Sequence, residues 1–110
     1  QKVIFTEARL LQGELLLEMA KLENELGRLI SKARESVECL EKLDPQKLVP
    51  LFRSRKAKAH SVASALLAKA LYQQQLDKVD SPEDMEAEEI LHHIRQSFEI
   101  LKQAFEESYG

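Results

Sequence analysis

The chain has 110 residues, a length that fits one domain with a single hydrophobic core. Hydrophobic residues make up 44% and charged residues 32%, with only 3 glycines and 3 prolines, which favours long helices over a sheet protein or a disordered tail. The net charge of −3 argues against nucleic acid or an anionic membrane as the main partner, and no apolar run predicts a membrane span.

The first predicted helix spans residues 6–43. Apolar residues follow one another there at spacings of three or four, and charged residues with good helix propensity lie between them. This predicted seam consists of Ala8, Leu11, Leu15, Met19, Leu22, Leu26, Leu29, Ala33, Val37 and Leu40. Gly13 and Gly27 each cost such a helix about 1 kcal/mol relative to alanine, which a helix of this length tolerates.

Two further helices are predicted, over residues 51–79 and 82–108. Asp44 and Pro45 end the first helix, and Pro50 leaves room for only a short helical turn in the connection. The second helix is rich in alanine, which lets neighbouring helices approach closely. The third begins with Ser81 as a cap and Pro82 in the first turn. Its predicted seam consists of Ala87, Leu91, Ile94, Phe98, Leu101 and Phe105.

These elements predict an all-α fold, an antiparallel three-helix up-down-up bundle with a long first helix. Residues 1–110 form a single helical domain in this interpretation, and the ends at Gln1 and Gly110 are typical of a domain cut from a larger protein. Charged residues interrupt any apolar signal region near the N-terminus, and the lone Cys39 has no partner for an internal disulfide. We therefore expect an intracellular protein, cytoplasmic or nuclear.

The residue patterns argue against an enzyme and against a cofactor. The chain has no glycine-rich phosphate loop, nucleophile elbow or Cys-x-x-Cys pair. Glu89 and His92 form one Glu-x-x-His, the unit that di-iron bundles supply twice, but no second copy exists. No metal site is therefore predicted. Cys39 lies among glutamates, which oppose a thiolate, so a half-buried structural cysteine is expected.

His60 raises an alternative function. It lies on the polar side of the second helix, where we expect it to be exposed. The segment from Ala59 to Ser64 resembles the phosphoacceptor motif of histidine phosphotransfer domains in two-component relays. The resemblance covers six residues and implies phosphotransfer at His60. Ala63 and Ser64 stand where that family has lysine and glycine, which counts against the activity.

A run of cations opens the second helix and raises another alternative. The run comprises Arg53, Arg55, Lys56 and Lys58. Positive charge at a helix N-terminus opposes the helix dipole, so a sequence selected for stability alone would not place four cations there. They either are solvated or offset by Glu106 and Glu107, or they form a docking site for an acidic or phosphorylated partner.

The leading functional prediction is a non-catalytic protein–protein interaction or assembly module, a scaffold or adaptor domain. Some apolar residues lie off the predicted seams, where a narrow bundle would leave them exposed. On the first helix these are Leu10 and Leu17, and on the third they are Ile100 and Ala104 with His93 at the flank. We predict that these five residues contact a partner helix or a second copy of the chain.

Overall fold

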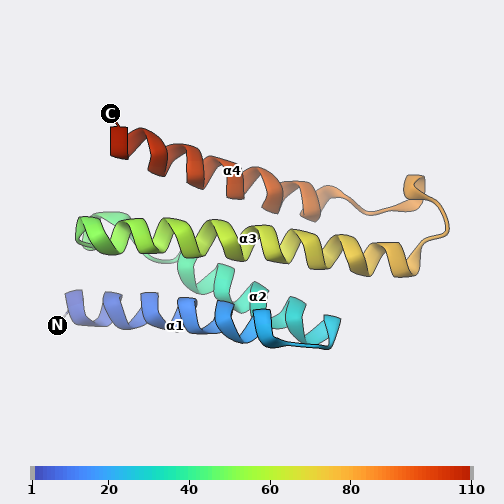
Figure 1. Cartoon of the computed structure of the whole chain (residues 1–110), viewed down its shortest axis with the longest axis horizontal. Coiled ribbons are helices and arrows are strands. Elements are labelled where there is room, and N and C mark those ends of the chain that lie inside the picture. The colour runs from blue at the N-terminus through green and yellow to red at the C-terminus, as the bar shows by residue number, and fades with distance from the viewer. Residues whose placement is uncertain (1, 110) are drawn as a thin grey trace.

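The structure is a computed structural model that describes the backbone of residues 2–109 and the side chains of residues 5–107. It confirms the all-α class, and no strand occurs among residues 2–109. The elements in chain order are α1 (Lys2–Leu22), α2 (Leu26–Glu41), the 3-10 helix η1 (Pro45–Lys47), α3 (Pro50–Lys78), the 3-10 helix η2 (Pro82–Asp84) and α4 (Glu88–Tyr109) (Figure 1).

The predicted three-helix bundle is wrong, because the long first helix is two helices. The chain leaves the helix after Leu22 and turns through residues 23–25, and Glu25 adopts an extended backbone just before α2. Asn24 favours such a turn, because its short polar side chain competes for backbone hydrogen bonds. Folding back lets the two halves bury their apolar faces against each other, which one straight helix does not allow.

The predicted bounds of the later elements are closer to the structure. The second predicted helix differs from α3 by one residue at each end, and the predicted helical turn is η1. The third predicted start is wrong: Ser81 caps η2, and α4 begins only at Glu88. Between them, the Gln75 side chain of α3 accepts a hydrogen bond from the Glu86 backbone N–H at 3.3 Å. This contact stabilises an extended connection where we expected a helix.

The four α-helices pack in sequence order in a flat molecule of 50 × 30 × 18 Å. α1 contacts α2, α2 contacts α3 and α3 contacts α4, and α2 lies behind the plane of the other three (Figure 1). The core lies between α1, α2 and α3, and α4 adds only Ile90 to it among the described residues. The core comprises Leu10, Leu17, Ala20, Ile30, Ala33, Val37, Leu40, Leu43, Ala59, Ala63, Leu67, Ala68, Ala70, Leu71 and Ile90.

α1 and α2 approach closely where Gly13 faces Ser36 and Leu40. The Ser36 hydroxyl is fully buried and donates a hydrogen bond to the Gly13 carbonyl oxygen at 2.7 Å. A Cβ atom built on Gly13 would lie 2.5 Å from Cδ2 of Leu40 and 2.7 Å from its Cγ. The sequence predicts only that a helix tolerates Gly13. The structure shows that the close contact between α1 and α2 requires a glycine there.

Replacing Gly13 by alanine should destabilise the protein by about 1–2 kcal/mol, because the clash with buried Leu40 outweighs the gain in helix propensity. Gly27 is the matched control, since its Cβ would meet only the Glu25 side chain, at 3.5 Å. Gly27→Ala should stabilise by up to about 1 kcal/mol. Urea unfolding followed by circular dichroism measures both. Stabilisation by both variants would show that α1 and α2 do not meet at Gly13.

Candidate interaction surface

Leu10 and Leu17 do not form the predicted exposed line. Their side chains are 1% and 5% exposed, and both belong to the core. The α1–α2 hairpin explains the error, because it turns the small residues Gly13 and Ala20 towards α2 and carries the two leucines inward with them. Both side chains pack inside the core, so the exposure on which the predicted contact depends is absent.

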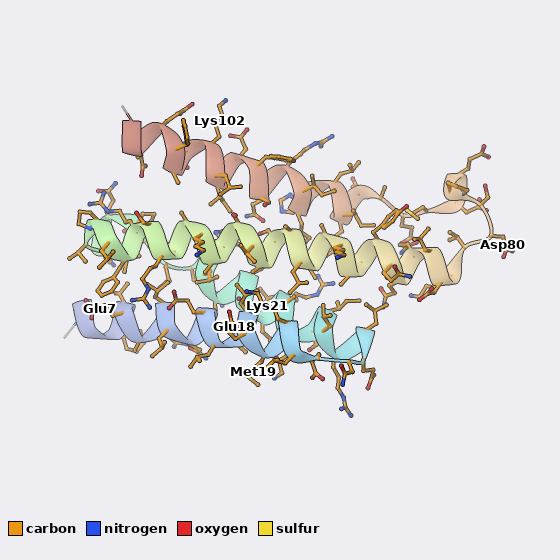
Figure 2. The ribbon with its side chains drawn as sticks, viewed as in Figure 1. Glu7, Glu18, Met19, Lys21, Asp80 and Lys102 are labelled. Atoms are coloured by element: carbon orange, nitrogen blue, oxygen red, sulfur yellow. The ribbon has the colours of Figure 1, made fainter. Side chains whose placement is uncertain are left out.

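The exposed face of α1 is the one that the sequence assigned to the core. Leu11 is 50% exposed, and Figure 2 shows Met19 on the outer side of α1, away from the other helices. The large hydrophobic residues exposed on α1 are Phe5, Leu11, Leu15, Met19 and Leu22. Glu18 interrupts this face, and Lys21 pairs with Glu18 at 3.2 Å. The face is therefore apolar but mixed with charge.

On α4, too, the face that the sequence predicts to be buried is exposed, and no charged residue interrupts it. Its outward stripe, which we call the α4 stripe, consists of Leu91, Ile94, Phe98, Leu101 and Phe105. Each is at least 36% exposed, and Phe98 reaches 69%. On the inward side, Ser97 is buried and its hydroxyl donates to the Ser61 carbonyl oxygen of α3 at 2.9 Å. The predicted contact residue His93 is also buried on this inward side, and Ile100 and Ala104 are half-buried there.

An apolar groove runs beside the α4 stripe. It lies between α3 and α4, has a volume of about 320 Å³, and is lined by Ala65, Ala68, Lys69, Tyr72, Ile90, Ile94, Ser97 and Phe98. Tyr72 and Phe98 stand on opposite walls and are both exposed. The groove and the stripe form one continuous apolar surface, because Ile94 and Phe98 belong to both.

His60 is not an exposed phosphoacceptor. Its side chain is buried between α2, α3 and α4, with Nε2 4.0 Å from the Glu41 carboxylate. Gln96 of α4 donates to the same Glu41 oxygen at 2.8 Å. Burial, reinforced by the Lys56 charge, lowers the pKa of His60 to about 4, although Glu41 acts in the opposite direction. His60 is therefore neutral at pH 7 and shielded from a docking enzyme.

The basic run does not form one exposed patch. Arg55 makes a bidentate ion pair with Glu14 of α1, and its guanidinium lies 5.0 Å from the Phe52 ring centroid. Arg53 donates from Nε to the Leu48 carbonyl oxygen at 3.2 Å. Lys56 is half-buried, and desolvation lowers its pKa. Lys58 is exposed, so the contacts of Arg53 and Arg55 divide the run and hold the N-terminal part of α3 against its neighbours.

Glu89 and Cys39, the other candidates from the sequence, have structural partners. Glu89 of α4 accepts hydrogen bonds from Nη1 and Nη2 of Arg34 on α2, at 2.6 and 3.3 Å, which lowers the Glu89 pKa. Cys39 is half-buried and its thiol donates to the Arg9 carbonyl oxygen at 3.3 Å, and burial raises its pKa. Among the described residues no three His, Cys, Asp or Glu side chains are grouped to hold a metal ion.

The α4 stripe was visible in the sequence but was assigned to the core. Its regular spacing identifies a helix face without showing which way that face points. The flank of the stripe that faces α3 carries Ser97 and Ala104, small residues that match the alanines and serines of α3. That match of small residues is the signal that places α3 on this side of α4.

No protein-family model, curated protein sequence or solved structure matches the chain. Within the described part of the chain, no helix has both the length and the apolar character needed to cross a membrane.

Proposed function

We propose that the chain is a non-catalytic interaction module that binds a partner's amphipathic helix along the α4 stripe. The exposure of Leu91, Ile94, Phe98, Leu101 and Phe105 on one face of one helix carries this proposal. Their spacing of three and four residues is the pattern by which a second helix is recognised. Phe98 is the expected anchor, because large exposed aromatic side chains dominate the energetics of such contacts.

The orientation of α4 supports the proposal. A helix on the surface of a monomer normally turns its more apolar face towards the core. α4 instead buries His93 and Ser97 and exposes its two phenylalanines. A second helix on the α4 stripe would give α4 apolar neighbours on both sides, and the groove beside Tyr72 would receive that helix.

The α1 face is the weaker candidate of the two. Glu18 breaks the row between Leu15 and Leu22, and the cavity beside α1 is lined mainly by charged and polar residues of α1, α2 and the connection that follows α2. The burial of His60 argues against phosphotransfer, and the ion pair of Arg55 with Glu14 argues against docking of an acidic partner on the basic run.

Phe98→Glu should weaken binding of an amphipathic helix at least roughly tenfold, because it places a charge at the centre of the apolar contact. The probe is a fluorescently labelled synthetic helix of three heptads with leucine at every core position, titrated with the full chain. Gln103→Glu is the matched control, since it adds the same charge to an exposed position of α4 away from the α4 stripe. Equal affinity of the two variants would refute the proposal.

A further inference from the structure

We propose that the helix bound on the α4 stripe is α4 of a second copy, running antiparallel in one defined register. This inference rests on the proposed function and names its partner. In heptad notation Leu91, Phe98 and Phe105 occupy the positions labelled a, and Ile94 and Leu101 occupy those labelled d. Ala87, the residue just before α4, continues the d series at the N-terminal end of the helix. In an antiparallel pair of such helices, each residue at position a of one helix lies opposite a residue at position d of the other.

One antiparallel register uses the whole stripe. It places Ile94 against Phe98 of the second copy, and Leu91 against Leu101 of the second copy. Small Ala87 then lies opposite large Phe105 of the second copy. Each of these contacts occurs twice, because the arrangement is symmetric about a twofold axis near residue 96. A shift by one heptad in either direction leaves part of the stripe outside the contact.

The charges beside the stripe select the antiparallel arrangement. One flank, at the heptad g positions, is covered by α3 and is uncharged, since it consists of Ile90, Ser97 and Ala104. The other flank, at the e positions, is exposed and carries Glu88, Arg95 and Lys102. Figure 2 shows Lys102 on the side of α4 that faces away from α3.

A parallel pair would place each charged flank against the uncharged one, whereas an antiparallel pair sets the two charged flanks against each other. In the register above, Glu88 meets Lys102 of the second copy at both ends of the contact. Arg95 meets Arg95 of the second copy at the twofold axis. The interface therefore contains one repulsive contact between two attractive ones. This pattern of charges distinguishes the proposed register from other arrangements of the two helices.

Charge reversal tests the register. Sedimentation of the full chain over a concentration series at low salt should show a monomer–dimer equilibrium. Glu88→Lys and Lys102→Glu should each raise the dissociation constant roughly tenfold, because two attractive contacts become repulsive. The double variant should return close to the wild type, and Arg95→Gln should dimerise more tightly. A wild type that stays monomeric, or a double variant as weak as the single ones, would overturn the proposal.

Cross-linking tests the orientation independently. Cys39 is first replaced by serine, which keeps a hydroxyl donor for the Arg9 carbonyl oxygen. Glu88→Cys and Lys102→Cys are then made separately and treated with a short bis-maleimide. A mixture of the two proteins should cross-link, and each alone should not. Cross-linking of Glu88→Cys with itself would demonstrate a parallel pair and refute the antiparallel one.

The two proposals fail in different ways. If the wild type stays monomeric and still binds the leucine probe through Phe98, the interaction module stands and self-association is refuted. If Phe98→Glu neither changes the sedimentation of the protein nor weakens the probe, the α4 stripe is not an interface and both proposals fail.

Discussion

Replacing Leu10 by alanine should lower the free energy of unfolding by about 2–5 kcal/mol, whereas the same change at Leu11 should lower it by less than about 1 kcal/mol. The two leucines are adjacent in the sequence but face opposite environments. Leu10 is 1% exposed in the core, and Leu11 is half exposed on the outer side of α1. Truncating Leu10 removes apolar contacts and leaves a cavity, and truncating Leu11 removes mainly solvated surface.

This pair of variants tests the rotation of α1 about its own axis. A straight helix over residues 6–43 with Leu11 in its seam would give the opposite order of stabilities. Denaturant unfolding of both variants measures the difference, and the dependence on denaturant concentration should stay the same if the fold is retained. A larger loss at Leu11 than at Leu10 would show that α1 presents its other face to α2.

Acidification should destabilise the fold by about 2 kcal/mol between pH 7.5 and pH 5 through His60 alone. Its pKa falls from 6.5 in the unfolded chain to about 4 in the fold. Between these values the unfolded chain binds a proton that the native protein does not, so stability decreases as the pH falls through this window. Below about pH 4 both states are protonated and this contribution to the loss is complete.

The groups around His60 determine the size of this effect. Lys56 of α3 and His93 of α4 lower the His60 pKa further, and Glu41 of α2 raises it. Burial also lowers the His93 pKa, which adds a loss of the same sign. Arg34 lowers the Glu89 pKa below its ordinary value of 4.5, so the stability that this carboxylate contributes begins to be lost only at the acid end of the histidine window.

A variant series isolates the histidine contribution. Unfolding free energies measured from pH 4.5 to 7.5 should change much less with pH in His60→Gln than in the wild type. His92→Gln is the control, because His92 is an exposed histidine on α4. If the unfolding free energies of His60→Gln and His92→Gln both vary with pH as that of the wild type does, His60 is not buried at the α2–α3–α4 contact.

The sequence predicted α3 well because both of its ends carry strong local signals. Pro50 suits the first turn of a helix, and the chain after Lys78 leads into a serine and a proline. The break between α1 and α2 has no comparable local signal. The apolar spacing continues across residues 22–26 without a change of phase, so an unbroken helix and a hairpin fit the pattern equally well. Only the burial gained by folding back distinguishes them.

The faces of α1 and α4 were predicted wrongly for one physical reason. Periodicity favours the side with the largest apolar residues, whereas close helix packing favours the side with the smallest. Gly13 and Ala20 bring α1 against α2, and Ser97 brings α4 against α3. The large residues Leu11 and Phe98 are left outside. The spacing of the residues therefore identifies these faces, but only the fold shows that they are exposed.

The order of packing also bears on how the chain acquires its structure. Each helix packs mainly against its neighbour in sequence, and this locality favours rapid folding because few long loops must close. The α1–α2 hairpin and α3 bring together nearly all of the core, and among the side chains that the structure describes α4 contributes Ile90 alone. We therefore expect α4 to be the last helix to dock and the first to detach. Its apolar stripe would then form late, on a scaffold that has already folded.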